Sequence, residues 1–170
     1  MGSNASMPYN VDLVFCIDAT ASMTPLIDMV KKNAINFQMD LAAAMEAKKK
    51  QINQLRIRVI AFRDFLADQN DAIMATGFFT LPQDTDLFVR SVSSITAFGG
   101  GDDPEDGLEA LAYAMRSKWT PRMSDTKNRQ IIVVWTDAAT HEIGYGSSAS
   151  NYPVDKMPKT FGELSMWWPD

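Results

Sequence analysis

The sequence has few of the residues that build disulfides or zinc sites: its 170 residues include one cysteine and one histidine. A single cysteine excludes a disulfide within the chain and fits a reducing compartment, so we expect a cytoplasmic protein. Cys16 lies inside an apolar run and is expected to be a small buried residue. Typical zinc sites are built from several cysteines and histidines, so the composition does not support one.

Positive charge and long apolar runs are also scarce. The chain has 16 lysines and arginines against 21 aspartates and glutamates, which gives a net charge of −5. Binding of nucleic acid needs a basic surface, so this balance argues against a nucleic-acid partner. No apolar run approaches the roughly 20 residues of a membrane span, and the first ten residues lack a signal-peptide pattern. We therefore expect neither nucleic acid nor a membrane as partner.

The stretch that organises the chain is residues 11–23, VDLVFCIDATASM. A nearly continuous apolar run ends at Asp18, and Thr20 and Ser22 follow at alternate positions. Thr24-Pro25 predicts the start of a helix, whose apolar positions recur at helical spacing to about Lys50. A buried strand that ends in oxygen-bearing side chains before a helix is typical of α/β proteins with a site at the carboxyl edge of a sheet.

Further strands are predicted at residues 55–62, 72–81 and 130–135, and a short helix at 84–95. Gly77 interrupts the strand at 72–81, which we expect to be an antiparallel edge strand because its connection is too short for a helical crossover. Residues 143–160 have the composition of a loop, and residues 161–168 that of one or two helical turns.

A second helix is predicted to start at Pro104, with Asp103 as its cap. We expect Leu108, Leu111, Met115 and Trp119 on its buried face. Strands alternating with helices predict a Rossmann-like three-layer α/β sandwich with a mainly parallel central sheet. Residues 1–6, MGSNAS, resemble a cloning remnant. We expect one domain over residues 7–170, with its core in 11–141 and an irregular segment in 142–170.

Three loops converge if the first strand is central and the strands ending before Asp64 and Asp137 flank it. The side chains brought together are then those of Asp18, Thr20, Ser22, Asp102 and Asp137. All offer oxygen, which suits a hard cation, Mg²⁺ above all, with Mn²⁺ or Ca²⁺ as substitutes. Two of the ligands are neutral hydroxyls, so the site leaves the ion short of negative charge. An open position would then accept a carboxylate from a protein partner.

These residues resemble a known family. Asp18-Ala19-Thr20-Ala21-Ser22 is similar to the D-x-S/T-x-S signature of the von Willebrand factor type A domain, which opens its metal-ion-dependent adhesion site. The run GGGDDPED resembles the second loop of that site, and Thr136-Asp137 the third. The resemblance spans roughly residues 11–141 and is strongest to the intracellular type A domains, including those joined to α-kinases. It implies a Mg²⁺-binding module for protein partners that is not an enzyme.

Two departures from the family pattern stand out. The threonine of the second loop falls at Gly101, which has no side chain, and Asp102 is the nearest replacement. The sequence also shows only about thirty residues after Asp137, whereas the family fold continues with further strands and helices. We expect either a shortened segment or a reduced sheet whose edge is covered by residues 143–170.

Two other functions remain open at this stage. Residues 18–22 also resemble the loop of haloacid dehalogenases and P-type ATPases, in which Asp18 would be the nucleophile of a phosphoryl-transfer enzyme. That loop lacks its usual second acidic or basic residue, and only Lys31 and Lys127 offer themselves as a phosphate clamp. The third reading is a structural domain with an empty site.

Several side chains near the site have two readings. Asp64 either supports the metal ligands from behind or forms an ion pair with Arg63 or another surface charge. His141 is expected to be a hydrogen-bonded loop residue rather than an acid or base. Trp167 and Trp168 are expected to pack onto the fold.

Overall fold

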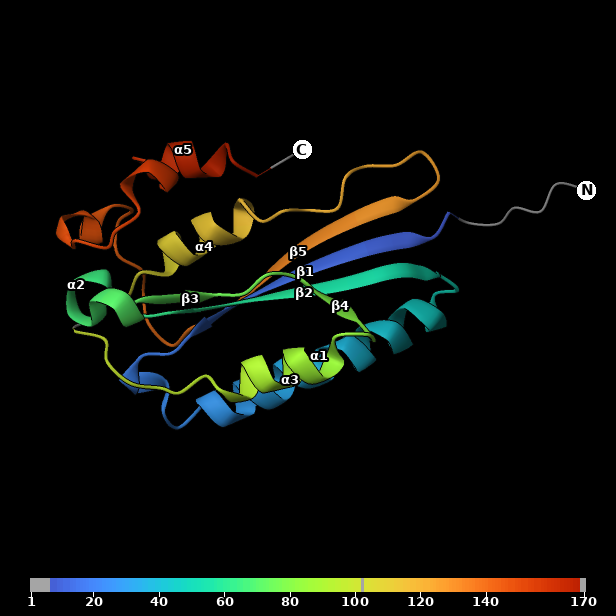
Figure 1. Cartoon of the computed structure of the whole chain (residues 1–170), viewed down its shortest axis with the longest axis horizontal. Coiled ribbons are helices and arrows are strands. Elements are labelled where there is room, and N and C mark those ends of the chain that lie inside the picture. Colours follow the sequence, from blue (N-terminus) through green and yellow to red (C-terminus); the bar gives the residue numbers. More distant parts are fainter. Residues whose placement is uncertain (1–6, 102, 169–170) are drawn as a thin grey trace, which may run out of the picture.

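The computed structural model describes residues 7–101 and 103–168. Its sheet has β1 (Tyr9–Asp18) at the centre, flanked by β2 (Ile52–Phe62) and β5 (Lys127–Trp135), both parallel to it (Figure 1). Two short strands, β3 (Ile73–Ala75) and β4 (Phe79–Leu81), pair antiparallel with β2. The predicted central strand, parallel sheet and interrupted antiparallel edge are therefore confirmed.

Helices cover both faces of this sheet (Figure 1). One face carries α1 (Ile27–Ala47) and α3 (Thr85–Ser93), and the other carries α4 (Gly107–Met115) with α5 (Phe161–Ser165) outside it. The short α2 (Phe65–Asp68) follows β2 directly. Single 3₁₀ turns complete the chain: η1 (Ala21–Met23), η2 (Gln69–Asp71), η3 (Tyr145–Ser148) and η4 (Val154–Lys156). Within the described residues, no helix has both the length and the apolar character that a bilayer span requires.

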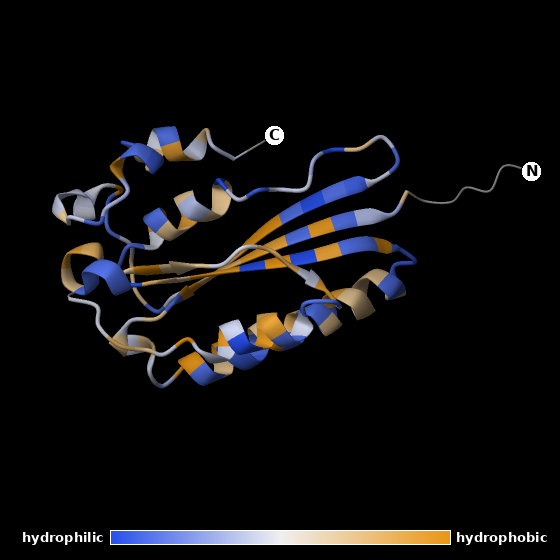
Figure 2. Cartoon of the chain, in the orientation of Figure 1, coloured by the Kyte–Doolittle hydropathy of each residue, from blue (hydrophilic) through white to orange (hydrophobic). Residues whose placement is uncertain are grey.

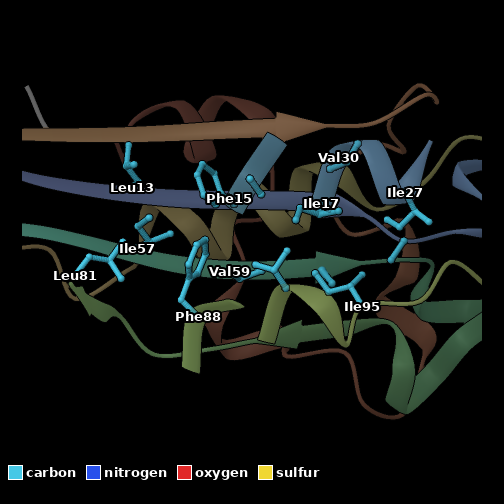
Figure 3. Packing of buried hydrophobic residues seen from close by; sticks show 14 of the residues in the cluster. Leu13, Phe15, Ile17, Ile27, Val30, Ile57, Val59, Leu81, Phe88 and Ile95 are labelled. Carbon is cyan, nitrogen blue, oxygen red and sulfur yellow. The ribbon is translucent and has the colours of Figure 1, made fainter. Parts of the chain in front are cut away.

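The central strand is buried along its whole length because both of its faces are covered. Leu13, Phe15 and Ile17 point toward α1 and α3, where they pack with a set of apolar side chains that Figure 3 shows from close by. Val14 and Cys16 point the other way, toward α4. Alternate side chains of a strand lie on opposite faces of the sheet. Because helices cover both faces here, the central strand needs apolar residues at almost every position. Figure 2 shows the same apolar concentration along the strands.

The first helix begins at Ile27, two residues later than Pro25, the first helical position that the sequence pattern predicts. The chain after Thr20 first forms the 3₁₀ turn η1, and the hydroxyl of Thr24 donates to the carbonyl of Ala21 instead of capping a helix. The α-helical hydrogen bonds start with the amide of Val30, which donates to Leu26, and the helix ends at Ala47. The prediction of Pro25 as the first helical residue was wrong because the chain forms a 3₁₀ turn and a further turn before α1 begins.

The second predicted helix start was also wrong. Asp103 is exposed and caps nothing, and α4 begins only at Gly107. The intervening backbone bends at residues 103–104 and pairs at Glu105 with the loop after β5. The amide of Glu105 donates to the carbonyl of Ala139, and the amide of His141 donates to the carbonyl of Glu105. This pairing holds residues 104–106 out of the helix.

The buried face of α4 differs from the predicted one as well. The residues that face the sheet are small, Ala110 and Ala114. The larger side chains of Leu108, Leu111 and Met115 are half-buried against the C-terminal segment. Helix α4 therefore has two apolar sides, one toward the sheet and one toward residues 149–167. A search for one apolar stripe selects the larger residues and misses the alanines.

The C-terminal segment packs onto α4, as the sequence predicts for the tryptophan pair. The guanidinium of Arg116 lies 3.6 Å from the ring centre of Trp167. The ring of Trp168 meets that of Trp119 edge to face at 6.1 Å. These contacts fix residues 161–168 beside the second helical layer rather than against the free edge of β5.

The amino-terminal end of the sheet is held by one buried ion pair. Asp12, in β1, is 2% exposed and accepts two hydrogen bonds from the guanidinium of Arg56, at 2.8 and 2.9 Å. The amide and hydroxyl of Thr120 donate to the same carboxylate. The carboxylate therefore joins two strands and the segment that leads into β5.

Replacing this carboxylate should destabilise the fold without touching the opposite edge of the sheet. Removing one partner of a buried ion pair leaves the other uncompensated, so Asp12→Ala should lower the free energy of unfolding by about 3 kcal/mol. Urea unfolding followed by circular dichroism measures this change. Asp28→Ala is the matched control, because the side chain of Asp28 is 95% exposed and its contact with Lys31 is a surface pair. Equal losses in the two variants would contradict the assignment.

Candidate metal centre

The carboxyl ends of three neighbouring strands lie at the left edge of Figure 1. The register places Asp18 opposite Phe62 of β2 and Ile17 opposite Trp135 of β5. The last residues of the strands are therefore level with one another. The polar residues that follow them emerge at one edge of the sheet, as the order of the strands predicts.

A chain of hydrogen bonds joins the predicted site residues of the first and third loops. Asp18 Oδ1 accepts from the amide of Thr20 at 3.0 Å and from its hydroxyl at 2.7 Å. The hydroxyls of Thr20 and Ser22 are 3.1 Å apart, and Ser22 donates to Asp137 Oδ1 at 2.9 Å. The hydroxyl of Thr136 donates to Asp18 Oδ2 at 2.8 Å. The structure thus brings Asp18, Thr20, Ser22 and Asp137 together.

The glycine loop closes over the first loop through its backbone. The amide of Ala21 donates to the carbonyl of Gly99, and the amide of Gly100 donates to Asp68 Oδ2 at 2.8 Å. Gly99 and Gly100 have φ values of +67° and +77°, which favour glycine. A Cβ atom at Gly100 would lie 2.7 Å from Glu105 Oε1 and 3.0 Å from Thr20 Cβ. The loop can approach the site this closely only without a side chain there.

Arg63 ties the loops of the site to one another. Its guanidinium donates to the carbonyls of Ala19 and Phe98, and also to those of Thr96 and Asp71. Its charged group also lies 3.8 Å from the ring centre of Phe98. Burial lowers the pKa of Arg63 from its ordinary value, and the nearby carboxylates of Asp68 and others oppose that change.

Asp64 does not use its neighbour Arg63 as an ion-pair partner. Its Oδ1 accepts from the amide of Ala67 and caps α2, and its Oδ2 lies 3.3 Å from Nε2 of His141. The expectation that His141 is a hydrogen-bonded loop residue is thereby confirmed. The choice that the sequence left open for Asp64 is settled against the pair with Arg63.

An open cavity of about 410 Å³ lies over the hydrogen-bonded chain. Its walls come from all three loops, and the described residues that line it are Ala21, Ser22, Gly99, Gly100, Gly101, Asp103, Glu105, Asp137 and Ala138. None of these carries a positive charge, and four carry a hydroxyl or carboxyl group. The predicted ligand Asp102 lies outside the described residues, and Gly101 offers no side chain to the cavity.

Sequence reasoning missed Glu105. It is 5% exposed, it lines the cavity, and its Oε2 is buried without a hydrogen-bond partner. Burial, helped by the charges of Asp18 and Asp64, raises the pKa of Glu105 to about 8. The acid-rich run GGGDDPED was the only sequence signal, and it does not say which of its four acids turns inward. That choice follows from the backbone pairing of Glu105 with residues 139–141.

A family model for the von Willebrand factor A domain matches residues 12–148, which is most of the chain. The chain belongs to this family. The match includes every segment that builds the carboxyl edge described above. The resemblance noted from the sequence is therefore confirmed for the whole α/β core.

One curated relative and two solved structures with a similar fold come from longer proteins. The alpha-protein kinase vwkA of Dictyostelium discoideum is 31% identical over 143 residues, which are 84% of this chain and 21% of that protein. Two crystal structures of the pilus adhesin SpaC from Lactobacillus rhamnosus GG have a TM-score of 0.55 and 15% identity, and they match 77% of this chain. The match covers 16% and 15% of those chains. Identity that low shows the fold alone, and the domain spans about a fifth of the curated relative.

Adding one methyl group at Gly100 should disturb the site. Gly100→Ala puts a side chain at a positive φ, which costs about 1–2 kcal/mol, and forces Glu105 or Thr20 to move. We expect the free energy of unfolding to fall by about that amount, as measured by urea titration. Gly77→Ala is the matched control, since nothing lies within 4 Å of its added Cβ and its φ is not positive. An unchanged Gly100→Ala protein would show that the loop does not need its close approach.

Proposed function

We propose that this type A domain is a protein-interaction module whose binding depends on Mg²⁺ held at the carboxyl edge of the sheet. Asp18, Thr20, Ser22 and Asp137 are its proposed ligands. The observation that supports this most is the spacing of four oxygens, Asp18 Oδ1, the hydroxyls of Thr20 and Ser22, and Asp137 Oδ1. Successive members of this series lie 2.7, 3.1 and 2.9 Å apart.

This spacing matches the donor set of a hard cation. Oxygens bound to Mg²⁺ at the corners of an octahedron lie about 3 Å from their neighbours. Ordinary O–H···O hydrogen bonds have a similar length, so the same side chains stay in place without an ion. Little rearrangement is then needed for them to bind one. Mn²⁺, which also prefers oxygen, is the expected substitute, and Ca²⁺ is a larger alternative.

Glu105 is the proposed source of further negative charge. Its Oε2 is buried without a hydrogen-bond partner, and its Oε1 lies 2.7 Å from where a Cβ atom on Gly100 would be. Asp18 is near enough to help raise the pKa of Glu105. A cation beside Glu105 would compensate its carboxylate, which is otherwise buried without a positive partner in the described residues. Glu105 would then provide the second-loop ligand that the family's threonine provides and that Gly101, which stands in its place, cannot. Asp102 stays a predicted ligand from the same loop.

The open cavity gives the module a place for its partner. The lining residues leave one side of the site facing solvent, and a carboxylate from a protein partner is the group that suits an ion left short of charge. Protein binding is the family's established use, so we infer a partner with an exposed aspartate or glutamate. Binding alone accounts for every residue of the site, and no general base is needed.

Phosphoryl transfer finds no support in the described part of the site. The two lysines that could have clamped a phosphate are engaged or distant. Lys31 donates to the carbonyl of Ile95, and Lys127 begins β5, at the opposite end of that strand from Asp137. With no basic side chain in the described lining, the negative charge of a phosphate would be repelled. We therefore propose a module without catalytic activity.

Titration with Mg²⁺ by calorimetry tests this proposal. Wild-type protein should bind Mg²⁺ in the first site, and Ser22→Ala should lower the affinity at least about tenfold because it removes a ligand. Ser93→Ala, on the exposed side of α3, is the matched control and should bind as wild type does. Parallel titrations of Glu105→Gln and Asp102→Asn decide which acid of the second loop contributes. Equal affinity of wild type and Ser22→Ala would reject this site.

Partner binding has a separate test. Peptides selected on the wild-type domain in Mg²⁺ should be enriched in aspartate or glutamate, and chelator or Ser22→Ala should release them. Peptides that keep binding in chelator would contradict the metal-dependent mechanism. Release of inorganic phosphate from phosphorylated substrates, lost in Asp18→Asn, would instead favour the enzyme.

A further inference from the structure

A second set of metal-ligating side chains lies next to Glu105, outside the cavity already described. Asp64, Asp106 and His141 each offer one ligand atom, and these atoms all lie within 4.8 Å of one another. The three residues are 1%, 1% and 6% exposed. They come from three separate segments: the cap of α2, the residue before α4 and the loop after β5.

The backbone pairing of the second and third loops brings these residues together. The amide of His141 donates to the carbonyl of Glu105, so Asp106, the next residue, lies beside the histidine. The ring of Tyr145 stacks on that of His141, with ring centres 3.8 Å apart and planes 10° apart, which fixes the orientation of the imidazole. The group is thus held by hydrogen bonds and packing on several sides.

Both carboxylates are anchored to α2 by one oxygen each. Asp64 Oδ1 accepts from the amide of Ala67 at 2.8 Å, and Asp106 Oδ2 accepts from the amide of Phe65 at 2.6 Å. The other oxygen of each carboxylate is the one that a metal ion could contact. Asp64 Oδ2 lies 3.3 Å from His141 Nε2, and Asp106 Oδ1 is buried without a hydrogen-bond partner. A buried carboxylate oxygen with no partner is costly unless something binds there.

The surroundings of the group hold further buried carboxyl groups. Glu105 and Glu109 are buried beside the group, and each has one oxygen without a partner. Asp64 makes an ion pair with His141. The guanidinium of nearby Arg63 donates to backbone carbonyls. Even a protonated His141 would leave this region short of positive charge.

We propose that Asp64, Asp106 and His141 form a second cation site, distinct from the Mg²⁺ site, that takes a divalent transition ion of the zinc class. An imidazole nitrogen with two carboxylate oxygens suits zinc better than magnesium, which prefers oxygen alone. Ligands at 2.0–2.1 Å from a tetrahedral zinc ion lie about 3.3 Å apart, which is the spacing of His141 Nε2 and Asp64 Oδ2. The site would join α2, the start of α4 and the loop after β5.

This inference does not depend on the first site, and the experiment keeps the two apart. Protein stripped with chelator is dialysed against Zn²⁺ in excess Mg²⁺, and bound zinc is measured by mass spectrometry. Wild type should retain one zinc ion per chain, and so should Ser22→Ala, which lacks a ligand of the Mg²⁺ site. Asp106→Asn and His141→Gln should bind zinc at least about tenfold more weakly. Glu142→Gln, the exposed neighbour of His141, should match wild type.

A thermal-unfolding scan guards against variants that merely misfold. Zn²⁺ should raise the melting temperature of wild type and of Ser22→Ala, and should not raise that of Asp106→Asn, whose shape is conserved. Co²⁺ bound in place of zinc should give visible absorption bands that His141→Gln loses. The proposal is overturned if wild type retains no zinc, or if Asp106→Asn and His141→Gln retain as much as wild type.

Discussion

The parallel pairing of β1 with a strand on each side is the constraint on which the rest of the structure depends. With β2 and β5 in register beside it, all ten residues of β1 are buried, and its two polar ends must find partners inside the protein. At the amino end, Asp12 is neutralised by the guanidinium of Arg56. At the carboxyl end, the hydrogen bonds that Asp18 accepts from the described part of the chain come from hydroxyl and amide groups. Near the amino end of β1 the carboxylate of Asp12 therefore has a positive partner, whereas at the carboxyl end that of Asp18 has only neutral hydrogen-bond donors among the described residues.

That imbalance extends over the whole carboxyl edge. The loops place Glu105 and Asp106 near Asp18 and Asp64, and burial together with these neighbours raises the pKa of Glu105 to about 8 and of Asp106 to about 7. The guanidinium of Arg63 donates to backbone carbonyls and so fixes the loops in place. Buried carboxylates without a positive partner lower folding stability, and we propose that a bound cation compensates them at this edge.

The sequence alone predicts those parts of the molecule that follow from one strong local pattern. The apolar run before Asp18 predicts the central strand, and the alternate polar residues after it predict side chains that the structure joins by hydrogen bonds to Asp137. What sequence reasoning misses depends on backbone pairing between distant segments. The bridge from Glu105 to the loop after β5 delays α4 and turns Glu105 inward. Neither effect can be recognised from the spacing of neighbouring residues. The alanine face of α4 is likewise recognised only in the structure, where the C-terminal segment covers the other side of the helix.

The central claim is that separate loops hold a hard cation through oxygen atoms at one edge of the sheet. A crystal structure of the domain grown with Mn²⁺, which scatters anomalously and substitutes for Mg²⁺, tests it most directly. The account predicts an anomalous peak within about 2.5 Å of the Ser22 hydroxyl, enclosed by Thr20 and Asp137. A structure in which these side chains keep their hydrogen bonds to one another, with no peak among them, would contradict it.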